Sequence, residues 1–283
     1  MESVSPESAA PEPTPQADGT GEMWRAILMG TDPQYARTRR LLQRVPGHPR
    51  CKMCAAPFGG IGAPLMRMVG RRRWAKNPKY CGSCFRVLEE HHGGAEIECS
   101  LLFADVRGST AMAEGISPAD FSRLMARFYE TASEVLVERD AIVDKFVGDE
   151  VMALFIPAVA GEQHARRAVD AAQALLRATG HADATGPWLP VGAGVHTGTA
   201  FVGSVGETIQ AEITALGDVV NTAARLASSA AGGEILVTDA AATAAGLEAS
   251  ALEHRQLELK GKSLATDVVV VPVGREIGVA PGS

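Results

Sequence analysis

The sequence predicts an α+β fold: an antiparallel-rich mixed sheet with flanking helices, preceded by a small four-cysteine module. Three observations lead to this prediction. Short β-rich runs alternate with amphipathic helical stretches between residues 96 and 274. Two Cys-x-x-Cys pairs lie in a basic segment ahead of them. A chain of 283 residues is long enough for one large domain and one small one.

The N-terminal part divides into a tail and a helical segment. Residues 1–21 predict a disordered tail, because they are rich in Pro, Glu, Ser and Ala and contain almost nothing to bury. Residues 22–47 predict two helices. The first covers Trp24–Met29 and ends at a glycine, and the second begins at a Thr-Asp-Pro cap and runs to Val45.

Residues 48–86 predict a basic, zinc-ribbon-like module. Cys51 and Cys54 form one pair, and Cys81 and Cys84 form a second pair twenty-six residues later. This spacing is typical of a four-thiolate Zn²⁺ site. The module needs a bound metal ion to stabilise its fold, because it has few large apolar residues to build a core. They are Phe58, Ile61, Leu65, Val69 and Trp74. An iron–sulfur cluster and thiol redox chemistry are the alternatives.

The charge of the chain is unevenly distributed. Residues 35–86 contain thirteen Lys and Arg but no Asp or Glu, although the whole chain has a net charge of −6. The run Arg71–Lys76, with Trp74 inside it, suggests a nucleic-acid surface. We nevertheless do not expect nucleic-acid binding, because charge alone reports mostly nonspecific attraction. A solvated face, or a surface that meets the acidic remainder of the chain, explains the run equally well.

No apolar run approaches the roughly 20 residues of a membrane-spanning helix. The first residues also lack the basic and apolar regions of a signal peptide. We therefore expect a cytoplasmic protein with no membrane partner. In that compartment cysteines stay reduced or bind metal.

The large domain begins after a connecting helix at residues 87–95 and covers residues 96–274, with a tail at 275–283. A buried strand over 96–105 delivers Asp105 to a Gly-Ser-Thr turn of a size that suits phosphate groups.

Two amphipathic helices and a hairpin follow. A capping box at Ser117 begins a helix of about five turns, and a second helix covers about 162–179. Between them, the hairpin at 141–155 places Asp149 at its tip.

The last third of the domain predicts further strands around one helix. Glycines alternate in a strand at Val191–Ala200, whose hairpin partner we place at Phe201–Gly206. A helix begins at Asp218, and strands follow at about 234–238, 251–259 and 266–273. The order β-α-α-β-β-α-β-β-α-β-β-β fits a ferredoxin-like sheet.

Three motifs in this domain carry a family resemblance. They are a phosphate loop at 105–110, a Lys-x-x-Gly-Asp hairpin at 145–149 and a Gly-Asp-x-Val-Asn-x-Ala-x-Arg helix at 217–225. In this order they resemble the class III nucleotidyl cyclases over about residues 96–274, and three motifs in order are a stronger signal than one.

The resemblance implies two-metal catalysis. Asp105 and Asp149, helped by the backbone carbonyl of Val106, would ligate two Mg²⁺ or Mn²⁺ ions. Asn221 would orient the ribose, and Arg225 would neutralise charge on the α-phosphate. The phosphate-binding residues would be Gly108, Ser109 and Thr110 at a helix start, together with Lys260 or Lys262.

Lys145 and Thr214 would select the base. A lysine donates to adenine N1 and a hydroxyl accepts from the 6-amino group, whereas guanine would require an acceptor such as Glu. The pair departs from the Lys/Asp pattern of many adenylyl cyclases but is similar to a Lys/Thr variant found in bacteria. ATP is therefore favoured over GTP.

We accordingly expect an adenylyl cyclase that converts ATP to 3′,5′-cyclic AMP and pyrophosphate and is regulated through its cysteine module. The resemblance implies a head-to-tail homodimer. Each site would take its two aspartates from one chain, and Lys145, Thr214, Asn221 and Arg225 from the other. The alternatives are a catalytically silent nucleotide-binding protein and a nucleic-acid-associated protein with a cyclase output, while a guanylyl cyclase is less favoured.

Overall fold

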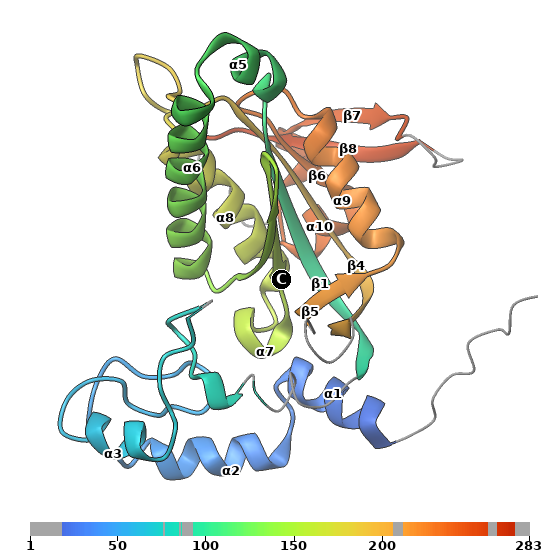
Figure 1. The fold of residues 1–283 in the computed structure, drawn as a ribbon. Coiled ribbons are helices and arrows are strands. Elements are labelled where there is room, and N and C mark those ends of the chain that lie inside the picture. Colours follow the sequence, from blue (N-terminus) through green and yellow to red (C-terminus); the bar gives the residue numbers. More distant parts are fainter. Residues whose placement is uncertain are drawn as a thin grey trace, which may run out of the picture.

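The computed structural model describes residues 19–75, 77–84, 86, 93–205, 212–259 and 265–274. Its centre is a mixed sheet with the strand order β2-β3-β1-β4-β6-β8-β7, to which β5 adds by pairing with β4 (Figure 1). Every pairing is antiparallel except that of β4 with β6. The strands are β1 (Gly93–Val106), β2 (Ile142–Val147), β3 (Glu150–Phe155), β4 (Val191–Val205), β5 (Glu212–Leu216), β6 (Ile235–Thr238), β7 (Glu253–Leu257) and β8 (Thr266–Val271).

Helices cover both faces of the sheet. The described α-helices are α1 (Gly19–Met29), α2 (Pro33–Leu42), α3 (Ala63–Met68), α5 (Ser109–Gly115), α6 (Pro118–Glu138), α7 (Pro157–Ala160), α8 (His164–Ala178), α9 (Asp218–Ser229) and α10 (Asp239–Ala244). Leu102 and Ala104 of β1 face a core shared with α6, α8 and α10. Leu101 and Phe103 face the opposite core, which α1, α7 and α9 complete. This alternation along β1 follows the two-residue period of a strand and confirms the predicted α+β architecture.

Local sequence signals set the helix starts. Ser117 accepts a hydrogen bond from the Asp120 amide, and Pro118 occupies the first turn of α6. Asp32 caps α2 in the same way by accepting from the Tyr35 amide. The helix predicted at Trp24–Met29 is longer, because α1 already begins at Gly19. Of the connecting helix predicted at 87–95, residues 93–95 belong instead to β1, because Gly93–Ala95 pair with β4. Residues 87–92 and the C-terminal tail at 275–283 lie outside the described residues.

One predicted hairpin is wrong. Phe201–Val205 does not turn back on the preceding residues but continues β4, which is one strand of 15 residues. Its antiparallel partner is β5, with Gly203 opposite Thr214. The physical reason is that Thr199–Val202 contains no turn residue, and β4 pairs over its whole length with the equally long β1.

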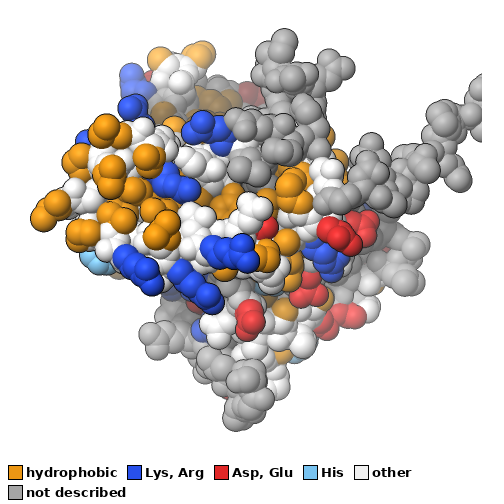
Figure 2. Space-filling view, turned by 90° about the horizontal axis from the view of Figure 1, so that it is seen from below, with side chains coloured by type: hydrophobic (Ala, Val, Ile, Leu, Met, Phe, Trp, Pro, Cys, Tyr) orange, Lys and Arg blue, Asp and Glu red, His pale blue; other side chains and the backbone are white. Residues whose placement is uncertain are grey.

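The expected core of the cysteine module is also wrong in part. Ile61 is 89% exposed and Met68 85% exposed, and Leu65 and Val69 are exposed as well. The buried residues of the module include instead the four cysteines, Met66 and Tyr80. Figure 2, which views the molecule from below, shows hydrophobic side chains beside Lys and Arg side chains on the side where α3 lies. The buried centre of the module is therefore built around the cysteines and not around a core of large apolar side chains.

None of the helices in the described part of the chain has the length and apolar character to span a membrane.

Candidate active site and metal centre

Asp105 lies on β1, and Asp149 lies at the tip of the neighbouring β2–β3 hairpin, as predicted. Asp105 is the next-to-last residue of β1 and lies opposite Glu150, the first residue of β3. Asp149 occupies the turn between β2 and β3, and its carbonyl accepts a 3.1 Å hydrogen bond from the Val106 amide. The sheet register therefore brings both side chains to one edge of the domain.

The carboxyl groups of Asp105, Asp149 and Glu150 lie close together at this edge. Burial raises the pKa of Asp105, an effect that the negative charge of Asp149 increases and a contact with Arg107 opposes. Burial, and then the charges of Asp105 and Asp149, raise the pKa of Glu150 to about 7. The Ser109 hydroxyl donates to the Asp149 carboxyl group. Three carboxyl groups thus share a site that a cation would stabilise.

The predicted phosphate loop forms a tight turn next to this edge. Gly108 has a φ of 71° and caps α5, a left-handed backbone that favours glycine. A cavity of about 640 Å³ lies between the turn, α6 and the tip of the β2–β3 hairpin. Its lining includes Ser109, Thr110, Gly148 and Asp149. The site thus has room for a ligand against the loop.

Thr214 and Lys145, the two candidates for base selection, both lie next to the side chain of a third residue, Asp144. Thr214, on β5, donates a 2.5 Å hydrogen bond to Oδ2 of Asp144 on β2. Lys145 Nζ lies 3.7 Å from the same oxygen. The sequence analysis did not identify Asp144, because an Asp ahead of the Lys-x-x-Gly-Asp motif has no distinctive signal.

Asn221 and Arg225 occupy α9, which packs closely on β4. A Cβ at Gly194 would lie 2.5 Å from the Ala227 amide, so only glycine permits this approach. The C-terminal end of α9 reaches the phosphate loop, where Arg107 donates to the Ser228 carbonyl at 2.8 Å. Among the described residues, no hydrogen bond or ion pair joins Asn221 or Arg225 to either aspartate. Lys260 and Lys262 lie outside the described residues.

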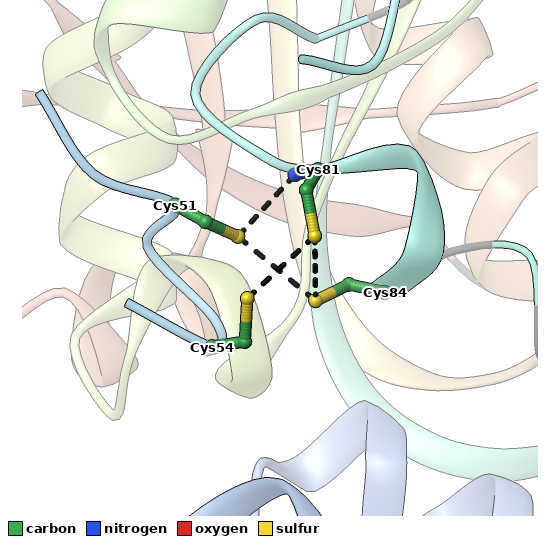
Figure 3. A group of neighbouring side chains, drawn as sticks. All are labelled: Cys51, Cys54, Cys81 and Cys84. Atoms are coloured by element: carbon green, nitrogen blue, oxygen red, sulfur yellow. Dashed lines mark hydrogen bonds between the residues drawn. The ribbon is translucent and has the colours of Figure 1, made fainter. Parts of the chain in front are cut away.

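The four cysteines converge as predicted. Their sulfur atoms all lie within 4.8 Å of one another, and all four side chains are buried. Figure 3 shows the sulfurs of the two pairs pointing toward one another. Hydrogen bonds among the thiols lower the pKa values of Cys54 and Cys81 and raise those of Cys51 and Cys84. The donor set fits a tetrahedral metal ion, which would ionise all four thiols.

The cysteine module is anchored on the junction between α6 and β2. Lys52, inside the first Cys-x-x-Cys pair, donates to Asp140, whose side chain is 3% exposed. Asn77 donates a 2.9 Å hydrogen bond to the Ala141 carbonyl. Lys79 donates to the Glu138 carbonyl at 2.5 Å. Residues within and near the two Cys-x-x-Cys pairs therefore contact the larger domain.

Comparison with known proteins identifies the larger domain. A family model described as the adenylate and guanylate cyclase catalytic domain matches residues 94–271. The chain belongs to the adenylate and guanylate cyclase family.

Relatives of this cyclase include proteins named adenylate cyclase. Adenylate cyclase 1 of Rhizobium meliloti (strain 1021) is 37% identical over 144 residues, 48% of this chain and 22% of that protein. The adenylate cyclase of Anabaena cylindrica is 29% identical over 186 residues, 61% of this chain and 36% of that protein. The matched region thus spans well under half of either relative.

Solved cyclase structures share the fold. The adenylyl cyclase CyaB from P. aeruginosa superposes with a TM-score of 0.55 at 27% identity, covering 65% of this chain and 98% of that one. The guanylyl cyclase Cya2 gives a TM-score of 0.58 at 24% identity, covering 67% of this chain and 100% of that one. Cyclases of both named specificities therefore have this architecture.

Proposed function

We propose that this cyclase converts ATP to 3′,5′-cyclic AMP and pyrophosphate. The observation that carries the proposal is the contact of Lys145 and Thr214 with one carboxyl group, on a cyclase fold that also brings Asp105 and Asp149 to one edge. Lys145 would donate to adenine N1, and Thr214 would accept from the 6-amino group. The relatives named adenylate cyclase support the same substrate.

Asp105 and Asp149, with the Val106 carbonyl, are the proposed ligands of two Mg²⁺ or Mn²⁺ ions. The fit rests on their charge: burial, and to a smaller extent the Asp149 carboxyl group, raise the pKa of Asp105, and a divalent cation would offset both effects. When bound, the ions supply a lower pKa for the ribose 3′-hydroxyl and neutralise charge on the triphosphate. Arg107 and Ser109, which contact these aspartates in the present structure, would release them when the ions bind.

The remaining groups would position the nucleotide. Ser109 and Thr110 line the cavity, and the backbone amides of Gly108, Ser109 and Thr110 would bind the β- and γ-phosphates. Asn221 would orient the ribose, and Arg225 would stabilise charge on the α-phosphate as the 3′-oxygen attacks and pyrophosphate leaves. Lys260 and Lys262 are proposed to reach the terminal phosphates.

Two sites shared across a head-to-tail homodimer are the proposed assembly. Within the described part of one chain, Asn221 and Arg225 make no hydrogen bond or ion pair with the aspartates, so a second chain is the natural source of the missing half. In this arrangement each nucleotide meets Asp105 and Asp149 of one protomer, and the base-reading and α9 residues of its partner.

The four cysteines are proposed to hold Zn²⁺ and to regulate the cyclase. Four buried thiols within reach of one ion are the usual ligands of structural zinc, and an iron–sulfur cluster uses the same set. Regulation is supported by the anchoring of this module at Asp140 and Ala141, immediately before the strand that bears Lys145.

A nucleotide assay tests the proposed activity. Purified protein should form cyclic AMP from ATP with Mn²⁺ or Mg²⁺, and the rate of cyclic GMP formation from GTP at the same concentration should be much lower. A folded, dimeric protein that binds ATP without turnover would be a silent nucleotide-binding relative instead. Elemental analysis of the same sample tests the module, for which we expect one zinc per chain and no iron.

A further inference from the structure

A β-bulge interrupts the pairing of β2 with β3. Val143 lies opposite Ala153 and Lys145 opposite Met152, so Asp144 is the extra residue of the bulge. Bulges redirect side chains and are frequent beside active sites. Here the Asp144 side chain is turned inward and is 1% exposed, whereas that of Lys145 remains 41% exposed. The bulge lets two successive side chains meet while only one of them reaches solvent.

The buried carboxyl group joins two distant parts of the chain. Oδ2 of Asp144 accepts the hydrogen bond of the Thr214 hydroxyl at 2.5 Å, and the Lys145 ammonium lies 3.7 Å from this oxygen. Thr214 is itself buried on β5. One oxygen therefore contacts both residues assigned to the base.

This contact determines whether the Thr214 hydroxyl can donate a hydrogen bond to the base or only accept one. A free threonine hydroxyl both donates and accepts, so by itself it distinguishes poorly between the 6-amino group of adenine and O6 of guanine. Once its only hydrogen is bonded to Asp144, the oxygen can only accept. An obligatory acceptor matches the 6-amino group and repels O6. The Lys145 ammonium, held beside the same carboxyl group, has only hydrogens to donate, which suits N1 of adenine and opposes N1–H of guanine.

We propose that Asp144 determines base selectivity by fixing Thr214 as an acceptor and by holding the Lys145 ammonium beside it. The inference rests on the proposed adenylyl cyclase activity and on Lys145 and Thr214 as the base-reading pair. Asp144 is a positioning residue, because it acts through these two side chains and is itself buried away from the nucleotide.

The first test is Asp144→Asn. Asparagine keeps the shape but can present an N–H to Thr214, which frees the hydroxyl to donate to guanine O6. We expect kcat/KM for ATP to fall about 10- to 100-fold, the range for losing a buried hydrogen bond to a charged group. The loss should lie mainly in KM, since the metal and ribose residues are unchanged. The ATP/GTP ratio of kcat/KM should fall at least about tenfold. A folded variant with an unchanged ratio overturns the proposal.

A rescue variant excludes a merely structural effect. Asp144→Asn combined with Thr214→Asp moves the carboxyl group to position 214, where it is a permanent acceptor and no longer needs Asp144. The ATP/GTP ratio should return to within about threefold of the wild type. Because the pair again contains one carboxyl group, which can accept a hydrogen bond from the amide at position 144, this variant also serves if Asp144→Asn alone fails to fold. A folded double variant that stays unselective contradicts the proposal.

Equilibrium binding separates this inference from the proposed activity. Fluorescent ATP and GTP analogues are titrated into wild type, both variants and the control Asp170→Asn, a half-exposed residue of α8. If the wild type forms no cyclic nucleotide, the proposed activity is wrong. The change in the ratio of ATP to GTP affinity between wild type and Asp144→Asn still tests the role of Asp144. If wild type cyclises ATP but Asp144→Asn keeps the wild-type ratio in both assays, only the inference fails. Asp170→Asn should match the wild type throughout.

Discussion

The surroundings of Asp105 disfavour its negative charge. Burial and the charge of Asp149 both raise the pKa of Asp105, and Arg107 offsets part of this effect. The Asp105 charge is therefore maintained at a cost in stability, as is typical of groups that serve a ligand rather than the fold.

Asp105→Ala and Asp149→Ala should each reduce cyclase activity to less than about a tenth of normal under saturating Mn²⁺, because each removes a shared metal ligand. Neither substitution should lower the thermal midpoint, since each removes like-charge repulsion. Cyclic AMP assays and thermal unfolding check both statements. Retention of more than a tenth of the turnover in either variant would show that another residue ligates the metal.

His164 predicts a pH dependence of stability. It is buried at the start of α8, where Nδ1 shares a 2.9 Å hydrogen bond with Ser100, and burial lowers its pKa. Below the unfolded value of about 6.5 the unfolded chain binds the proton first, so stability falls as pH decreases toward the folded pKa. Above about pH 6.5 both states are neutral and the effect vanishes.

We expect the urea midpoint of the wild type to drop further between pH 7.5 and 5.5 than that of His164→Gln. Glutamine retains a hydrogen-bonding group but cannot titrate. All other titrating groups are common to both proteins, so the difference between the two slopes isolates His164. Equal slopes would mean that the imidazole is protonated equally well in the folded protein.

At the level of helices and strands, the features that depend on local sequence signals could be predicted from the sequence. The 3.6-residue periodicity and the Ser117 cap located α6, and Met125, Phe128, Ala132 and Leu136 are buried in it as expected. Two Cys-x-x-Cys pairs sufficed to predict that the four sulfurs meet. These signals are local, so neighbouring residues alone carry them.

Features that depend on long-range pairing were missed. The length of β4 follows from pairing with β1, almost a hundred residues earlier in the chain. The bulge at Asp144 depends on the register with β3, and its role depends on Thr214, seventy residues away. Likewise, composition alone could not show that Ile61, Leu65 and Val69 are exposed while the four cysteines are buried.

Asp140 is the element-level contact that is simplest to test. Its buried carboxyl group accepts from Lys52 of the module and from Arg167 of α8, at a residue with a φ of 67°. Asp140→Asn preserves the tolerance for this left-handed backbone but removes the charge. We expect the free energy of unfolding to fall by about 1–3 kcal/mol, with faster proteolysis in residues 48–86. Glu138→Gln, an exposed neighbour, should leave both unchanged. Wild-type proteolysis in Asp140→Asn would mean that the module docks without this contact.

The cysteine cluster makes a second prediction for the same element. Cys51→Ser or Cys84→Ser should lose the metal and unfold the module, because one missing thiolate removes most of the binding energy of a small site. Elemental analysis and limited proteolysis provide the readouts, with the buried but separate Cys99→Ser as the matched control. Unchanged metal content in both cluster variants would rule out the four-thiolate site.

For the whole molecule, shared sites predict complementation. Asp105→Ala and Arg225→Ala chains should each be nearly inactive alone, yet recover activity when mixed, because one site of the mixed dimer carries neither substitution. Random pairing makes half of the dimers mixed with one intact site each, so recovery should approach about a quarter of the wild-type activity per chain. If the mixture stays inactive although subunit exchange is shown independently, all catalytic residues must come from one chain.

The anchoring of the cysteine module at Asp140 and Ala141 also has a consequence for biosynthesis. Lys52 and Asn77 leave the ribosome long before their partners, which follow 88 and 64 residues later. The thiols are thus available to a metal ion while the catalytic sheet is still incomplete, and docking waits for the α6–β2 junction to emerge. A nascent chain would therefore acquire its metal first and its attachment second, so that a docked module marks a chain that has been made at least as far as the start of the catalytic hairpin.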